Sequence, residues 1–167
     1  KEKRAIYGDS AIVAVQGDKR VAYLLPGKFP GFKTMIKAML ALEPDFTVKG
    51  VEIMEHEEDP GLGGEITQDY FKNQFVGKPF GKLKELKVVK EPLPEEYRRI
   101  LEGAQIPPQE RARQLSQFKD KDIYALTGAT ISSKAVTEGL KGMASSFAYR
   151  FKNLEKIATT QGLRLAF

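Results

Sequence analysis

Two short stretches near the start of the chain carry the apolar pattern of β-strands. Residues 11–16 and 20–26 are rich in β-branched and other apolar side chains. Between them, Gly17-Asp18-Lys19 combines a glycine with polar side chains, as tight turns often do. The pattern therefore predicts an antiparallel hairpin.

A second pair of stretches, residues 33–43 and 47–56, is separated by the turn signal Pro44-Asp45. The later stretch alternates apolar with charged residues, which is typical of a half-buried strand. Its apolar positions are Val48, Val51 and Ile53. We expect a second hairpin here. Because the earlier stretch also contains residues that favour helices, a short helix over 33–43 is the alternative.

The regular pattern breaks at residues 58–65, where one proline and three glycines predict a loop. Residues 66–77 then place apolar side chains at helical spacing and end in Gly77, so a helix is expected there. Its apolar residues are Ile66, Tyr70, Phe71 and Phe75. This spacing identifies the three aromatic residues first of all as core residues.

The middle of the chain carries weaker signals. Residues 82–91 predict a strand. Residues 94–104 and 107–118 begin with proline and acidic side chains, as the first turns of helices often do, and two helices are expected.

The most regular pattern lies at the end of the chain. From Ser132 onward, apolar side chains recur every three or four residues over about seven turns, which predicts a long helix packed on the sheet. The stripe consists of Val136, Leu140, Met143, Phe147, Phe151, Leu154 and Ile157. The expected fold is a single α+β domain spanning 1–167: a largely antiparallel sheet built from hairpins, flanked by helices that include a long C-terminal helix.

Composition narrows the possible chemistry. The 167 residues include no cysteine, which excludes disulfides, thiol catalysis and thiolate metal sites. The net charge of +5 comes from lysines and arginines that are spread along the chain, so no nucleic-acid partner is expected. No apolar run approaches the roughly 18 residues that a membrane span needs. A soluble chain is therefore expected, and any membrane anchor would precede residue 1.

Residues 127–133, TGATISS, gather small and hydroxyl side chains just before the long apolar stripe. Gly128 and Ala129 allow another group to approach the backbone closely. Ser132 and Ser133 are good N-cap residues, and the unpaired N–H groups of a helix start favour a phosphate. The segment is therefore a plain helix cap, a phosphate site or a site where a hydroxyl is modified. The glycine-rich lysine signature of a nucleotide loop is missing.

Three motifs carry a resemblance to a known family. LTGATISSKAV, residues 126–136, resembles the flavinylation motif of the FMN-binding domain found in the RnfG and NqrC subunits of ion-translocating, membrane-bound oxidoreductases. EDPGLGGEI, residues 58–66, resembles that family's glutamate-threonine-proline-glycine-leucine-glycine signature, with Asp59 where threonine is usual. DYFKNQFVGK, residues 69–78, resembles the aromatic helix that follows it. The matches extend from about Lys33 to Val136, in the family's order.

The resemblance implies that FMN is attached through its phosphate to Thr130. A threonine hydroxyl is a weak nucleophile that needs a base, and the only histidine, His56, is distant from Thr130 in sequence. The resemblance implies that a separate flavin transferase, which uses FAD and a metal ion, makes the bond. Thr130 is then an anchor for covalent FMN, and the chain itself is expected to hold no catalytic residue and no metal site.

The residues expected to surround the cofactor come from two segments, residues 58–63 and 127–134. Backbone N–H groups at Ser132 and Ser133, with Thr127 beside them, are expected to hold the phosphate, while Lys134 screens its charge. Glu58 either contacts the flavin or caps local structure. The complete expected set is Thr127, Gly128, Ala129, Thr130, Ser132, Ser133, Lys134, Glu58, Gly61, Leu62 and Gly63. The last three are expected to lie against the ring or the ribityl chain.

By resemblance, the chain relays electrons with the other subunits of a membrane redox complex. It is expected on the extracytoplasmic face, periplasmic or outer, of the cell membrane, held there by an N-terminal anchor that is not in these 167 residues. The alternative is a non-redox module of the same fold that holds a phosphorylated ligand noncovalently or acts as a scaffold. A serine or threonine hydrolase is disfavoured, because no base lies near the motif in sequence.

Overall fold

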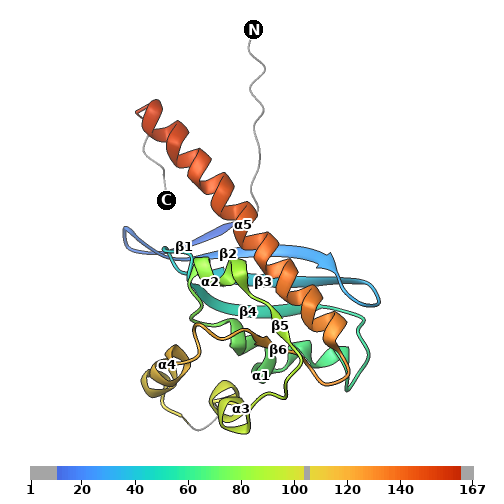
Figure 1. Ribbon diagram of the computed structural model, residues 1–167. Helices are drawn as coiled ribbons and strands as arrows, with labels where there is room; N and C mark the ends of the chain where they lie inside the picture. Colours follow the sequence, from blue (N-terminus) through green and yellow to red (C-terminus); the bar gives the residue numbers. More distant parts are fainter. Residues whose placement is uncertain (1–10, 104–105, 163–167) are drawn as a thin grey trace.

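A computed structural model of the protein describes residues 11–103 and 106–162. Four antiparallel strands form its central sheet, in the order β1-β2-β3-β4 (Figure 1). Their bounds are β1 (Ile12–Gln16), β2 (Lys19–Pro30), β3 (Met35–Leu42) and β4 (Val48–Glu55). Both expected hairpins are present, and Gly17 turns the first with a positive φ of 59°.

The ambiguous stretch 33–43 forms strand β3 rather than a helix. Every second side chain of β3 is fully buried, namely Ile36, Ala38, Leu40 and Leu42. A helix would not place these four residues on one face, so burial on the sheet overrides the local helix preference.

The expected helix over residues 66–77 is broken into three short turns. They are η1 (Gly63–Thr67), α1 (Asp69–Lys72) and η2 (Asn73–Phe75). Gln68 adopts an extended conformation, with ψ 145°, and this interrupts the helix. The core assignment is correct for Phe71 and Phe75, which are fully buried, while Tyr70 is half-buried.

The expected strand over residues 82–91 is wrong for most of its length. Its first part belongs to helix α2 (Phe80–Glu85), and only β5 (Val88–Val89) is extended. The spacing of Leu83 and Leu86, which are both buried, suits a helical turn rather than a strand. Strand β5 pairs in parallel with β6 (Ile123–Tyr124) as a separate two-stranded sheet.

The two expected helices that begin with proline are present as α3 (Glu95–Glu102) and α4 (Pro108–Ser116). Gly103, with a positive φ of 59°, ends α3, and the expected final residue, Ala104, lies outside the described residues. Tyr97 and Leu101 of α3 form a small satellite core with Leu115 of α4. Tyr97 also stacks on Phe118, which follows α4, with 3.8 Å between ring centroids.

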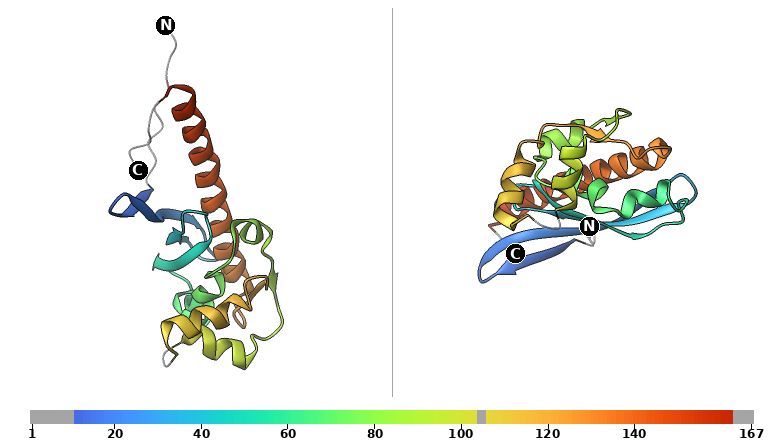
Figure 2. Two further views of the ribbon diagram at one scale, coloured as in Figure 1. Left: turned by 90° about the vertical axis from the view of Figure 1, so that its left-hand side faces the viewer. Right: turned by 90° about the horizontal axis from the view of Figure 1, so that it is seen from below.

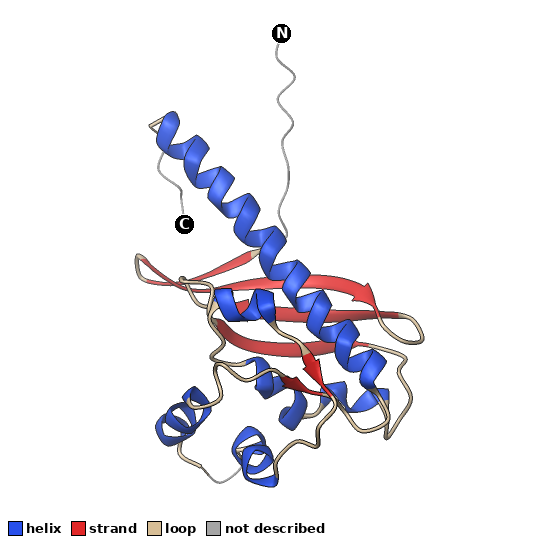
Figure 3. Ribbon diagram, in the orientation of Figure 1, coloured by secondary structure: helices blue, strands red, loops and turns tan. Residues whose placement is uncertain are grey.

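The long helix α5 (Thr130–Thr160) crosses one face of the sheet and then extends past it (Figures 2 and 3). Most of the predicted stripe is buried, including Val136, Leu140, Phe147 and Phe151, and Met143 packs against the same core. The prediction is wrong for Leu154 and Ile157, which are 41% and 52% exposed. Both follow Phe151, the last residue of the stripe that belongs to the core. No helix among the described residues combines the length and the apolar character of a membrane span.

Helix α5 approaches strand β2 closely because small residues stand at the contact. A Cβ at Gly139 would overlap the ring of Phe29, and a Cβ at Gly27 would lie 2.7 Å from the sulfur of Met143. Farther along, the rings of Phe147 and Phe151 pack around Tyr23 at 5.1 and 5.3 Å. The helix is therefore held at a fixed height above the sheet.

Two glycines of α5 allow a matched test of this packing. Both Gly139→Ala and Gly142→Ala gain helix propensity, about 0.5–1 kcal/mol. Gly142 faces open space, so its variant should raise the free energy of unfolding by that amount. At Gly139 the added methyl meets Phe29, and overpacking costs about 1–3 kcal/mol, so a net loss of stability is expected. Urea denaturation measures both, and equal stabilisation by the two variants would contradict the close contact.

The buried side chain of Lys78 makes the stability of the protein depend on pH. This side chain is fully buried, and its Nζ donates to the carbonyl oxygens of Phe118 at 3.1 Å and Lys121 at 2.6 Å. Burial, assisted by repulsion from Lys82, lowers the pKa of Lys78 to about 8. Between this pKa and its ordinary value, the unfolded chain binds more protons than the folded protein, so rising pH favours folding.

We therefore expect the stability of the wild type, relative to Lys78→Met, to rise by up to about 1.4 kcal/mol per pH unit from pH 8 to 10. Below pH 8 the difference should be constant, because both states of the wild type are protonated. Denaturant titrations of the two proteins at several pH values measure it. A difference that does not change above pH 8 would contradict the low pKa.

Candidate functional site

The motifs at residues 58–66 and 126–136 meet at one cavity of about 290 Å³. The loop after β4 forms one wall, the β2–β3 turn forms another, and the start of α5 forms the third. Seven of the expected site residues line the cavity: Glu58, Leu62, Gly63, Gly128, Ala129, Thr130 and Ser132. The other four, Thr127, Gly61, Ser133 and Lys134, are not part of its lining.

Thr130 is the first residue of α5, and its side chain lies at the cavity wall in a half-buried position. Gly128 turns the chain with a positive φ of 72°, and Ala129 occupies the N-cap position. A Cβ at Gly128 would lie 3.0 Å from Cδ2 of Leu62, so the absence of a side chain lets Leu62 pack over the turn. The small pair of residues thus brings the two motifs together.

The helix begins two residues earlier than its apolar stripe indicates, and this changes the roles of two serines. Ser132 and Ser133 are buried inside the first turn instead of capping it. The hydroxyl of Ser133 donates to the carbonyl of Ala129 at 2.9 Å and accepts from the N–H of Leu126 at 3.0 Å. Its own N–H donates to Ala129 at 3.0 Å. The prediction that Ser133 offers a free N–H to a phosphate is therefore wrong.

Glu58 is buried at the back of the cavity, with 4% of its surface exposed. Its Oε1 accepts from the backbone N–H groups of Phe32 at 2.9 Å and Lys33 at 3.1 Å. Its Oε2 accepts a short hydrogen bond from the hydroxyl of Ser132. These contacts agree with the role of capping local structure, and the other role that the sequence left open, a contact with the flavin, stays a prediction.

Two of the three glycines in the DPGLGG loop, Gly61 and Gly63, are required for different structural reasons. Gly61 adopts a positive φ of 71° and faces open space, so it serves the turn itself. At Gly63, a Cβ would lie 2.6 Å from the hydroxyl of Ser132 and 2.8 Å from Oε2 of Glu58. The missing side chain of Gly63 makes room for these two protein groups, and because Gly63 also lines the cavity, its expected contact with a flavin stays a prediction.

Three large apolar side chains surround the mouth of the cavity. Phe32, Leu62 and Ile131 line it and are 57%, 46% and 60% exposed. Sequence reasoning missed Phe32 and Ile131. The available signal for Phe32 was an aromatic residue in the turn between two strands, where polar residues are usual. A cluster of exposed apolar residues at a cavity is typical of a binding site.

The charged groups at the cavity are already paired. Lys33 and Asp59 form an ion pair whose hydrogen bond raises the pKa of Lys33. Nδ1 of His56 accepts a hydrogen bond from the N–H of Glu58 at 3.2 Å, so His56 caps the loop. The described residues hold no cluster of three metal-ligating side chains. Lys134 and Thr127 are exposed outside the cavity.

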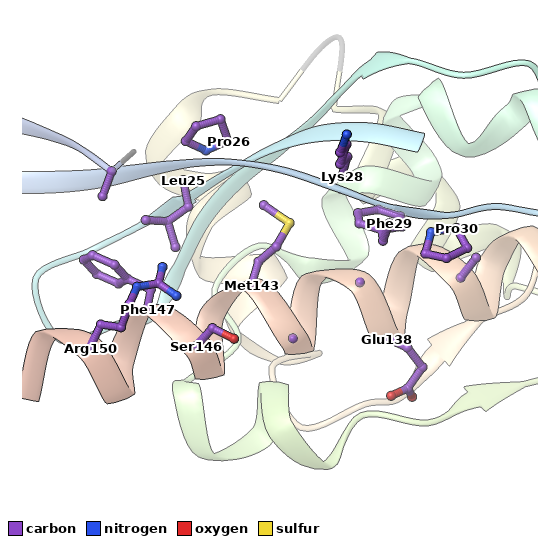
Figure 4. Close-up of a pocket in the computed structure, with 14 residues that line it drawn as sticks. Leu25, Pro26, Lys28, Phe29, Pro30, Glu138, Met143, Ser146, Phe147 and Arg150 are labelled. Carbon is purple, nitrogen blue, oxygen red and sulfur yellow. The ribbon is translucent and has the colours of Figure 1, made fainter. Parts of the chain in front are cut away.

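A larger cavity of about 550 Å³ lies between β2 and α5 (Figure 4). Leu25, Phe29 and Met143 fill the space between strand and helix, while Glu138 points away from the strand (Figure 4). None of the expected site residues lines this cavity. The smaller cavity is therefore the one that the sequence motifs build.

Comparison with known proteins identifies the family of the chain. The FMN-binding domain family matches residues 31–145, a range that includes both motifs. The G subunit of the proton-translocating ferredoxin:NAD(+) oxidoreductase complex of Clostridium ljungdahlii is 34% identical over 128 residues, which are 77% of this chain and 54% of that protein. The C subunit of the Na(+)-translocating NADH-quinone reductase of Neisseria meningitidis is 26% identical over 151 residues, 90% of this chain and 48% of that protein.

Among solved structures, NqrC of Shewanella oneidensis has a similar fold, with a TM-score of 0.55 and 26% identity. The similarity covers 77% of this chain and 51% of that one. The chain spans about half the length of the curated relatives it matches. The chain belongs to the FMN-binding domain family, and within that family it is similar to the RnfG and NqrC subunits.

Proposed function

We propose that the chain carries FMN in a phosphoester bond to Thr130 and relays electrons within an ion-translocating membrane complex of the Rnf or Nqr type. One observation carries the proposal: Thr130 is a half-buried residue and lines a cavity that the motifs at residues 58–66 and 126–136 build together. When bound, the flavin supplies the capacity to accept and donate electrons. The chain's own residues supply attachment, orientation and surroundings.

The residues at the cavity fit the chemical parts of FMN. Phe32, Leu62 and Ile131 offer apolar surface to an aromatic ring. The N–H groups of Thr130, Ile131 and Ser132 belong to the first turn of α5, which has no intrahelical acceptors for them. Together with the helix dipole, they favour the charge of a phosphate diester at Thr130. Lys134, one turn along the helix and exposed, adds positive charge on the solvent side.

Attachment requires an external enzyme in this proposal. Among the described residues that line the cavity, the two carboxylates are both engaged, Glu58 by three donors and Asp59 by Lys33. Neither is therefore available as a base for the hydroxyl of Thr130. A flavin transferase supplies the activation, and the chain supplies an accessible hydroxyl at a helix start.

The setting of the domain is part of the same proposal. The matched relatives are named as subunits of ion-translocating oxidoreductases, and this chain corresponds to about half of each. We infer a single domain over 1–167, held on the extracytoplasmic face of the membrane by an N-terminal anchor outside these residues. There it contacts the other subunits of the complex.

The test is co-expression with a flavin transferase of this family, followed by intact-protein and peptide mass spectrometry. The wild type should gain the mass of FMN less one water, on the peptide that contains Thr130. Thr130→Ala should gain nothing, because the attacking oxygen is gone.

Thr127→Ala is the matched control, since it removes an exposed hydroxyl three residues earlier that does not line the cavity. It should be flavinylated to at least half the wild-type extent. Modification of Thr130→Ala, or loss only in Thr127→Ala, would show that the wrong hydroxyl was chosen. A wild type that binds FMN reversibly without gaining mass would favour the noncovalent binding module.

A further inference from the structure

We propose that Glu58 is a positioning residue that sets the distance between two walls of the cavity, the β2–β3 turn with Phe32 and the first turn of α5 with Thr130. Its consequence for the cofactor rests on the proposed function, but its effect on the cavity does not. The role differs from a flavin contact, because both oxygens of the carboxylate accept hydrogen bonds from the protein itself.

The carboxylate connects segments that are remote along the chain. Phe32 and Lys33 stand 26 and 25 residues before Glu58, and Ser132 stands 74 residues after it. One oxygen holds the turn, and the other holds the helix. The separation of the two walls at this point is therefore fixed by the width of a single carboxylate group.

The position of Glu58 is fixed by two glycines on opposite sides of the carboxylate. A Cβ at Gly31 would lie 2.5 Å from Oε1, and a Cβ at Gly63 would lie 2.8 Å from Oε2. The backbone thus approaches both oxygens more closely than any other residue would allow. This enclosure leaves only 4% of the residue exposed, and both carboxylate oxygens are held by donors of the protein.

A carboxylate suits this place better than the amide of the same shape. All three partners are donors, and an ionised carboxylate offers only acceptor sites. A glutamine would keep one oxygen for the turn, but its NH₂ group would have to donate to the hydroxyl oxygen of Ser132, which reverses the direction of that hydrogen bond and removes the negative charge. The negative charge also lies beside the third residue of α5, where the helix dipole favours an anion.

The hydrogen bond to Ser132 extends to Thr130 through the helix. Thr130, Ile131 and Ser132 are consecutive residues of the first turn, so they move together. Phe32 carries its exposed ring on the other wall. Glu58 consequently determines how far the ring of Phe32 lies from the attachment oxygen, which is the space that an isoalloxazine ring has to enter.

The first experiment uses the flavin-free protein and needs no assumption about the cofactor. Amide hydrogen exchange and chemical shifts are measured by NMR for the wild type, Glu58→Ala, Glu58→Gln and Glu57→Gln. Glu57 is the matched control, because it is the exposed neighbour and loses the same charge. Glu58→Ala should accelerate exchange at Phe32 and Lys33 about tenfold or more, and should shift the signals of residues 128–132.

Glu57→Gln should leave both regions unchanged. If Glu58→Ala does not fold, Ser132→Ala serves instead, because it removes only one of the three donors to the carboxylate. It should still shift the amide signals of Phe32 and Lys33. These residues are remote from Ser132 in sequence and are linked to it through the carboxylate of Glu58. Unchanged exchange at Phe32 and Lys33 in Glu58→Ala, or no effect of Ser132→Ala on the turn, would overturn the proposal.

The second experiment measures the consequence for the flavin. After co-expression with the transferase, Glu58→Gln should carry at least threefold less attached FMN than Glu57→Gln, and its flavin fluorescence anisotropy should be lower because the ring is less confined. Equal attachment and equal anisotropy in the two variants would refute the consequence for the flavin. If the wild type takes up no FMN at all, the proposed function fails, and the NMR experiment alone decides whether Glu58 positions the walls.

Discussion

The enclosed carboxylate of Glu58 is the contact on which the geometry of the site depends. It accepts hydrogen bonds from the β2–β3 turn and from the first turn of α5, so it ties together parts of the chain that the sheet and the helix would otherwise place independently. Gly31 and Gly63 permit this contact because a side chain at either position would collide with the carboxylate. Gly63 of the motif at residues 58–66 is therefore needed for packing within the protein itself.

The core supplies the rigid frame behind that contact. Helix α5 lies against β2 through Phe29 and Gly139, and its far half is fixed by Phe147 and Phe151 around Tyr23. Because the same helix begins at Thr130, the position of the hydroxyl follows from packing along the sheet. A covalently held cofactor does not need an enclosing pocket to be retained, which agrees with a cavity that has an exposed apolar rim.

The sequence predicted the parts of this structure that depend on local patterns. Both hairpins and the long helix follow from alternation and from the stripe that includes Val136 and Leu140, and the motif around Thr130 was sufficient to locate the cavity. Local patterns failed where tertiary contacts decide the outcome. Residues 82–85 belong to helix α2 instead of a strand, and the stripe did not reveal that Leu154 and Ile157 stay exposed.

The site residues show the same division. Small and hydroxyl side chains identified the turn at residues 127–133, but the partner of Ser132 was out of reach, because Glu58 is 74 positions away. Phe32 was missed for a related reason, since its place at the cavity depends on where the β2–β3 turn folds. Motif spacing thus locates a site, whereas the fold is needed to tell which of its residues contact the rest of the protein and which face a ligand.

Thr130 is proposed to hold a flavin at the cavity formed by residues 58–66 and 126–136. A crystal structure of the flavin-loaded protein tests it most directly. We expect electron density that is continuous from Oγ1 of Thr130 to the FMN phosphorus, with the ring against Phe32 and Leu62. A flavin seated in the cavity between β2 and α5, or one joined to another residue while Thr130 stays unmodified, would contradict it.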